Sequence, residues 1–202
     1  MTQTQVTLAR PRSAAEYSEV LASNIEEYER LSRMIADMLF IAKADEGQIV
    51  PSQERLCLGE LMADLVEFHR LVAEEKGVVL THEGDGAMRG DPLMIRRAVG
   101  NLLSNAIRHT PPGGRVTASI LHEDSGSVVI AIANTGETVP AEHLPRLFDR
   151  FYRVDPSRTG EGSQSGLGLA IVKSIVEAHG GRVSVGSADG VTSFRLLFNA
   201  CA

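Results

Sequence analysis

The stretch DPLMIRRAVGNLLSNAIRHT, residues 91–110, decides how the rest of this sequence is interpreted. It opens with an Asp-Pro pair, typical of a helix start, and ends before the turn-forming Pro-Pro-Gly-Gly at 111–114. On a helix, Asn101, Asn105 and Arg108 fall on one face and apolar side chains on the other. A magnesium ion with phosphate oxygens would satisfy such polar groups on a half-buried helix. For a pair of asparagines alone, helix capping or a contact with a neighbouring element is the commoner explanation.

Residues 134–136, Asn-Thr-Gly, follow an apolar segment that we expect to be a buried strand. Gly136 would allow a sharp turn and a close approach of the backbone to a flat ligand, and Asn134 could hydrogen-bond the edge of a purine. Taken alone, however, the segment is better explained as an ordinary strand-to-helix turn.

An arginine-bearing loop and a glycine pair come next. Residues 149–165 have too little apolar periodicity for a core element, so this loop, with Arg153 in it, is either a lid over a nucleotide or a solvated insertion. Gly166, Leu167 and Gly168 then open an apolar helix, whose unpaired N–H groups would hold phosphate unless the glycines only permit a tight helix start. The glycines match neither a P-loop nor a dinucleotide-binding fingerprint, because the surroundings that those motifs require are missing.

In this order and spacing, the four segments resemble the N, G1, F and G2 boxes of the catalytic, ATP-binding domain of sensor histidine kinases. The resemblance runs from Asp91 to Leu169, and the helical stretch before it resembles part of the dimerisation and phosphotransfer hairpin of the same family. Residues 142–157, EHLPRLFDRFYRVDPS, further resemble the branch that senses heavy metals such as copper or silver.

The resemblance implies an ATP-dependent protein-histidine kinase with ATP and Mg²⁺ as cofactors. It implies Asn105 as the main magnesium ligand and Asn101 as a ligand of the same ion or of an adjacent phosphate. Arg108 would face the phosphates and Arg153 would approach them from the lid, so that positioning and charge neutralisation promote transfer. The other nucleotide-binding residues that it implies are His109, Asn134, Gly136, Gly166, Leu167, Gly168 and Thr192.

Three features depart from the family pattern. Asn134 stands where the family usually has an aspartate that binds the adenine amino group, and Gln164 stands where it often has its first G2 glycine. No histidine lies in residues 13–45, so none matches the phosphoacceptor; the histidines are His69, His82, His109, His122, His143 and His179. We therefore expect the acceptor to have been cut away before Met1, and the chain to bind Mg-ATP without forming a phosphohistidine.

The implied fold is α+β: a two-layer sandwich in which helices cover one face of a mixed sheet, preceded by a partial helical hairpin. Residues 13–45 lack glycine and proline and repeat apolar side chains at heptad spacing, and Ser13 with Glu16 has capping-box spacing. We expect a truncated hairpin over 1–48, with residues 3–10 as the end of its first arm, and the ATP-binding domain over 49–202. Helices are predicted at 13–45, 61–76, 91–108, 140–148 and 166–179, and strands at 54–58, 78–81, 115–121, 128–133, 182–185 and 193–198.

Composition limits the partners. The chain of 202 residues has a net charge of −6, which disfavours a protein whose main role is nucleic-acid binding. No run of about twenty apolar residues exists, so we expect a cytoplasmic fragment without a membrane segment. The family implies that the full-length protein sits in the bacterial inner membrane, forms a homodimer through the hairpin and passes phosphate to a response regulator.

Two alternatives remain open. A related enzyme of the same fold, such as an anti-sigma serine kinase or a chaperone or topoisomerase ATPase, would hydrolyse ATP or phosphorylate serine. Such hydrolytic relatives usually carry a glutamate where this chain has Asn101, which disfavours water activation. A non-catalytic dimerisation and signalling module that has lost nucleotide binding is the second alternative, and Asn134 and Gln164 are its best support.

Overall fold

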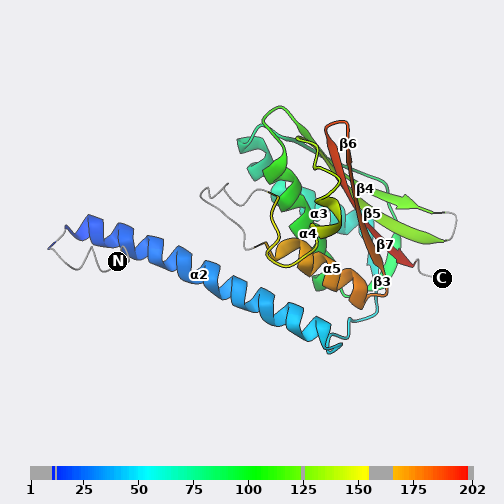
Figure 1. Cartoon of the computed structure of the whole chain (residues 1–202), viewed down its shortest axis with the longest axis horizontal. Helices are drawn as coiled ribbons and strands as arrows, with labels where there is room; N and C mark the ends of the chain where they lie inside the picture. The colour runs from blue at the N-terminus through cyan, green and yellow to red at the C-terminus, as the bar shows by residue number, and fades with distance from the viewer. Residues whose placement is uncertain (1–10, 12, 124–125, 155–165, 200–202) are drawn as a thin grey trace. The chain divides into compact units, whose positions relative to one another are not determined.

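A computed structural model describes residues 11, 13–123, 126–154 and 166–199 of the chain. The chain forms two compact units, Met1–Phe40 and Ile41–Ala202. Helix α2, Ala14–Asp45, forms most of the described part of the first unit and ends in the second (Figure 1). It begins with the predicted capping box. The backbone N–H of Ser13 donates to Glu16 Oε2 at 2.8 Å, and the backbone N–H of Glu16 donates to Ser13 Oγ at 3.3 Å.

The apolar stripe of α2 is exposed. Its large side chains are between 41% and 69% accessible; they are Leu21, Ile25, Tyr28, Leu31, Ile35, Met38 and Leu39. Most of the stability of a helix in a protein comes from packing of its apolar face and little from helix propensity. A helix with such an exposed stripe therefore requires a packing partner. The expected preceding arm, residues 3–10, lies outside the described residues.

The second unit contains a five-stranded mixed sheet in the order β2-β4-β5-β7-β6. Strand β2 runs parallel to β4, whereas the other neighbours are antiparallel. The strands are β2 Val79–Glu83, β4 Arg115–His122, β5 Ser127–Thr135, β6 Arg182–Ala188 and β7 Val191–Asn199. Helices α3, Leu58–Glu75, α4, Pro92–His109, and α5, Gly168–Ala178, cover one face (Figure 1). The predicted α+β sandwich is therefore confirmed.

The core between the layers is mainly aliphatic. The central helix α4 buries Ile95, Leu102 and Leu103 completely, and β5 buries Ile130 and Ile132 against it. The apolar positions of α4 recur at helical spacing, which is why this helix presents one face to the sheet and keeps its polar residues on the other.

Three local predictions need correction. The helix expected over 140–148 is wrong: only a short 3₁₀ helix, η1, forms at Leu144–Arg146, because Pro140 and Pro145 have no N–H to donate. An unpredicted strand, β3 Ala87–Gly90, pairs antiparallel with β1, Glu54–Cys57. The closing strands β6 and β7 are longer than expected, since Asp189 and Gly190, with φ of 51° and 75°, join them in a tight hairpin turn.

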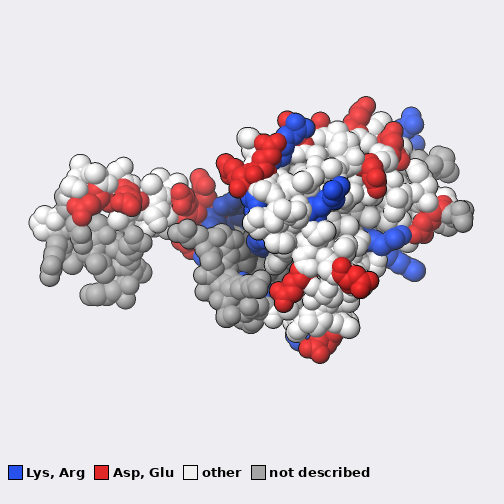
Figure 2. Space-filling view, turned by 90° about the horizontal axis from the view of Figure 1, so that it is seen from above, with Lys and Arg blue, Asp and Glu red and all other residues white. Residues whose placement is uncertain are grey.

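The surface carries charges of both signs. On the face seen in Figure 2, acidic and basic side chains are interspersed among the described residues, without a continuous basic area. Within the described part of the chain, no helix has the length and apolar character needed to cross a bilayer.

Candidate functional site

Helix α4 is fixed at its N-terminus by an aspartate cap. Asp91 Oδ1 accepts from the backbone N–H groups of Leu93 and Met94, each at 3.0 Å, and Pro92 occupies the first helical turn. The backbone N–H of Asp91 in turn donates to His179 Nε2 at 3.0 Å. Because His179 follows the last turn of α5, this bond ties the start of α4 to the end of α5.

The polar face of α4 reaches the start of α5. Asn101 Nδ2 donates to the carbonyl of Gly168, the first residue of α5, at 3.3 Å. One helical turn later, Asn105 Oδ1 accepts from the guanidinium of Arg108 at 2.9 Å. The half-buried amides are thus oriented by specific partners, and Asn101 keeps its own oxygen for a further ligand.

Positive charge gathers around the last turn of α4. Partial desolvation, followed by the charge of Arg153, lowers the pKa of the Arg108 guanidinium. Lys76 Nζ donates to the carbonyl of Ile107 at 2.8 Å and to that of Arg108, and burial followed by the charge of Arg108 lowers the pKa of Lys76. Cations near a helix C-terminus interact favourably with the helix dipole. The positive charges of Arg108 and Arg153, however, repel each other, so an anion bound between them would reduce this repulsion.

Gly136 allows a turn to pass close to the end of α4. A Cβ atom at this position would lie 2.9 Å from the backbone oxygen of His109, closer than any side chain could be accommodated without a shift. The N–H of Gly136 donates to the carbonyl of Gly190 at 2.8 Å, which connects this turn to the β6–β7 hairpin. His109 itself is exposed.

A row of polar side chains crosses three adjacent strands. Thr192 of β7 is the register partner of both Asn134 of β5 and Ser187 of β6. The hydroxyl groups of Thr192 and Ser187 lie 2.8 Å apart, and Ser187 Oγ accepts from the backbone N–H of Val139 at 2.9 Å. Asn134 and Thr192 are buried, and Asn134 Nδ2 donates to the carbonyl of Thr135 at 3.3 Å.

The glycines before α5 form the other border of the candidate site. Gly166 has a φ of 72°, and a Cβ there would lie 2.8 Å from Phe151 Cα. The N–H of Phe151 donates to the carbonyl of Gly166 at 3.0 Å, which joins the two described ends of the intervening loop. Leu167 is buried and caps α5, whose first N–H groups lack helical partners. Gln164 and the rest of 155–165 lie outside the described residues.

The predicted site residues therefore fall into connected groups. Asn101 contacts Gly168, Arg108 contacts Asn105 and lies near Arg153, Gly136 lies against His109, and Asn134 pairs with Thr192. Sequence reasoning missed Ser187, whose hydroxyl holds the turn after β5. The signal that could have found it is the Asp189-Gly190 pair, because a two-residue hairpin turn there puts Ser187 opposite Thr192.

The donor set suits a magnesium ion held jointly with phosphate. The described residues contain no cluster of three or more histidine, cysteine or acidic side chains that could hold a metal alone. Asn101 and Asn105 offer amide oxygens one helical turn apart, and Mg²⁺ commonly takes one or two protein oxygens together with phosphate and water. The residues present therefore fit this ion.

Comparisons with known proteins agree on one family. Residues 90–200 match the family described as histidine kinase-, DNA gyrase B- and HSP90-like ATPase. The chain is 48% identical over 198 residues to the sensor histidine kinase CusS of Escherichia coli O157:H7, which covers 98% of this chain and 41% of CusS. The chain thus spans less than half the length of this relative.

Solved structures give the same result. The crystal structure of full-length ShkA in complex with AMPPNP superposes with a TM-score of 0.81 at 27% identity, over 96% of this chain and 41% of ShkA. The mycobacterial sensor histidine kinase MprB superposes with a TM-score of 0.62 at 31% identity, over 72% of this chain and 96% of that structure.

Proposed function

The chain belongs to the family of histidine kinase-, DNA gyrase B- and HSP90-like ATPases, and we propose that within it the chain is the kinase core of a sensor histidine kinase. In this proposal it binds Mg-ATP and transfers the γ-phosphoryl group to a histidine that the chain itself does not contain. The observation that carries the proposal is the meeting of the polar face of α4 with the start of α5 and the Gly136 turn.

Asn101 and Asn105 would hold the magnesium ion together with the phosphates. A bound magnesium ion neutralises phosphate charge and helps to orient the transferred group. The family resemblance makes Asn105 the main ligand, and its amide oxygen, which accepts one bond from Arg108, has a second lone pair for the metal. The N–H groups of Gly166, Leu167 and Gly168 precede or begin α5, where an anionic phosphate is favoured.

Arg108 and Arg153 would act on the phosphates. Desolvation and then the charge of Arg153 lower the pKa of Arg108, and an anion between the two guanidinium groups would offset both effects. Since phosphoryl transfer depends mainly on positioning and on stabilising charge, two guanidinium groups beside the γ-phosphate would promote it without forming a covalent bond.

The purine would lie between the Gly136 turn and the polar row of Asn134, Thr192 and Ser187. The amide oxygen of Asn134 can accept a hydrogen bond from an adenine amino group. Thr192 offers a hydroxyl beside it, and His109 lies at the end of α4 against Gly136. An amide carries no charge, so this contact would be weaker than that of the aspartate that the family usually has.

The first part of the chain would belong to the dimerisation and phosphotransfer hairpin. We propose the division at residues 1–48 and 49–202. The exposed stripe of α2 supports a homodimer in the full-length protein, because its apolar side chains require a packing partner. The likeness to sensor histidine kinases also supports three further proposals. A response regulator would accept the phosphate, and a heavy metal would be the signal. The full-length protein would be anchored in the membrane, with this part in the cytoplasm.

A hydrolytic ATPase of the same fold is less well supported. The position one turn before Asn105 carries Asn101, whose amide donates to Gly168, and an amide cannot act as a general base for water. Steady ATP turnover by the purified chain would nevertheless favour that alternative.

Magnesium-dependent nucleotide binding tests the proposal directly. A fluorescent ATP analogue is titrated into the wild-type chain, Asn105→Leu and Asn199→Leu, with magnesium or with a chelator. Removal of the Asn105 oxygen is expected to weaken magnesium-dependent binding about tenfold or more, since bonds to charged groups are strong. Asn199, exposed near the end of β7, serves as the matched control and should leave the affinity unchanged.

Each other outcome has a distinct meaning. Absence of magnesium-dependent binding in the wild-type chain would favour the non-catalytic module. Equal affinities of the wild type and Asn105→Leu would remove Asn105 from its role while leaving nucleotide binding in place.

A further inference from the structure

Strand β6 forms one edge of the five-stranded sheet, and its outer side is open. It pairs with β7 from Arg182 to Ala188, and no other strand of the described residues pairs with it. In an edge strand, every second residue directs its backbone N–H and C=O away from the sheet. Natural edges are commonly protected by proline or lysine, but the β6 sequence RVSVGSA contains neither, and its single charged residue is the first.

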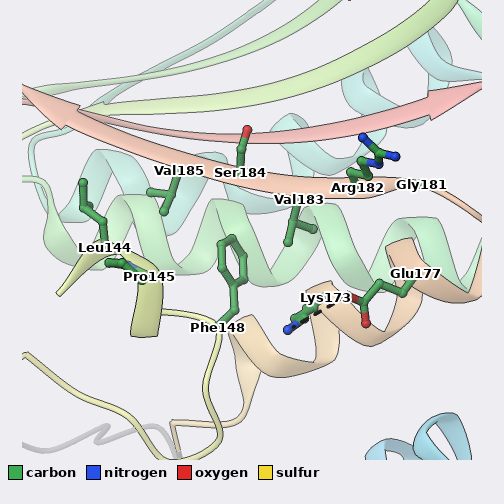
Figure 3. A pocket seen from close by; sticks show the side chains of 10 residues that line it. All are labelled: Leu144, Pro145, Phe148, Lys173, Glu177, Gly181, Arg182, Val183, Ser184 and Val185. Carbon is green, nitrogen blue, oxygen red and sulfur yellow. Dashed lines mark ion pairs between the residues drawn. The ribbon is translucent and has the colours of Figure 1, made fainter. Parts of the chain in front are cut away.

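A groove of about 490 Å³ runs beside this open edge (Figure 3). Its lining includes every residue from Gly181 to Val185 in succession. Successive side chains of a strand point to opposite faces, so a run of consecutive lining residues includes backbone as well as side-chain atoms. The backbone of β6 thus contributes to one side of the groove, while η1 and α5 form its other side (Figure 3).

The two faces of β6 differ beside the groove. Val183 and Val185 point to the side of the helices, where Leu144 and Phe148 also line the groove, whereas Ser184 points to the opposite side (Figure 3). Phe148 is held by an edge-to-face contact with Phe194, with ring centroids 6.1 Å apart. An added strand would thus meet apolar side chains on one face and polar ones on the other.

The charges beside the groove favour an acidic ligand. Lys173 and Glu177 of α5 form an ion pair with each other at 3.9 Å. Arg182 points to the same side of β6 as Ser184, away from the helices (Figure 3). No described carboxylate forms an ion pair with Arg182. Since opposite charges on neighbouring strands attract, an acidic residue across from Arg182 would complement it.

We propose that β6 and the adjoining groove bind an extended segment of a partner protein as a sixth strand of the sheet. The segment places alternate apolar side chains against Val183 and Val185 and an acidic side chain opposite Arg182. Backbone hydrogen bonds supply the affinity, and the alternation supplies the selectivity. None of the residues assigned to the nucleotide site lines this groove, although Ser187 of that site lies further along the same strand.

The test uses a synthetic peptide of the same length as β6, seven residues. The acetylated and amidated probe alternates valine with serine, threonine and two aspartates; a second version is N-methylated throughout, and a third replaces the aspartates by lysine. Amide shifts of the isotope-labelled full chain report where each probe binds. The first peptide should perturb Arg182–Ala188, and N-methylation should abolish binding, because it removes the backbone donors.

A charge-reversing substitution distinguishes a loss of peptide recognition from a loss of folding. Arg182→Glu should weaken the aspartate peptide about fivefold and strengthen the lysine peptide to a similar extent. Arg55→Glu, an exposed arginine on β1, is the matched control and should change neither affinity. Binding at β2 instead, equal binding of the N-methylated peptide, no binding, or pairing of β6 between two copies of the chain would each overturn the proposal.

Discussion

The hydroxyl of Ser187 holds together the residues at one edge of the proposed nucleotide site. Its oxygen accepts from the backbone N–H of Val139 at 2.9 Å and lies 2.8 Å from Thr192 Oγ1, so it links the turn after β5 to the β6–β7 hairpin. The side chain lies beside Thr192 in the row that contains Asn134. In the proposed site, Ser187 would hold these residues in place without touching the phosphates.

Substitution of this serine should affect base binding specifically. Ser187→Ala is expected to weaken Mg-ATP binding about fivefold, which corresponds to one net hydrogen bond, and to weaken inorganic triphosphate binding little. Calorimetric titration of both ligands measures the difference. Ser184→Ala, on the opposite face of the same strand, is the matched control. Equal losses for ATP and triphosphate would contradict a role near the base.

At the scale of the element, α4 depends on the cap that starts it. The backbone N–H of Met94 lowers the pKa of Asp91, with desolvation opposing it and the N–H groups of Ser52 and Leu93 adding to it. A lowered folded-state pKa means that the ionised carboxylate is favoured by folding. Its contribution is therefore present above the ordinary value of 3.8 and is lost as the pH falls through the folded value.

Asp91→Ala should lower the free energy of unfolding by about 1 kcal/mol near neutral pH. The difference from the wild type should shrink as the pH falls below 3.8, because the protonated carboxyl is a poorer cap. Urea unfolding of both proteins at pH 7, 5 and 3 measures this difference in the free energy of unfolding. Asp91→Asn retains a cap oxygen that does not titrate, so its loss should be small at neutral pH. A constant Asp91→Ala deficit down to pH 3 would contradict this account.

The elements that sequence predicted well are those with a long periodic signal. The heptad stretch, the helix opened by Asp91 and Pro92 and the apolar strand before Asn134 are all present. Predictions of the short elements failed. The four residues of β3, the last of them a glycine, carry too little pattern to identify a strand, and Pro140 and Pro145 prevent a regular helix at η1.

The candidate site could be outlined from sequence but not assembled. From the types and order of Asn101, Asn105, Gly136 and Gly168 we predict a nucleotide site, and the structure brings Asn101 and Gly168 into contact. Which atoms meet depends on packing between distant elements: the Asn101 amide on the Gly168 carbonyl joins residues 67 positions apart. Long-range contacts of this kind leave no local periodicity, and the same holds for the groove beside β6.

For the whole molecule, nucleotide binding and phosphate acceptance are separable. All six histidines lie outside residues 13–45, and His179 among them has a structural position between α5 and Asp91. Transfer requires an acceptor placed in line with the γ-phosphate, and a kinase core without one has nothing to phosphorylate within itself.

We therefore expect the chain, incubated with magnesium and γ-labelled ATP, to bind nucleotide but to retain no acid-labile label. When a histidine-bearing helical hairpin from a sensor histidine kinase is added without its own ATP-binding domain, label should appear on the hairpin, and Asn105→Leu should abolish it. Acid and alkaline treatment of the separated proteins distinguishes phosphohistidine from phosphoserine. Label on the chain itself would mean that one of its six histidines is an acceptor, and acid-stable label on the hairpin would favour a serine kinase.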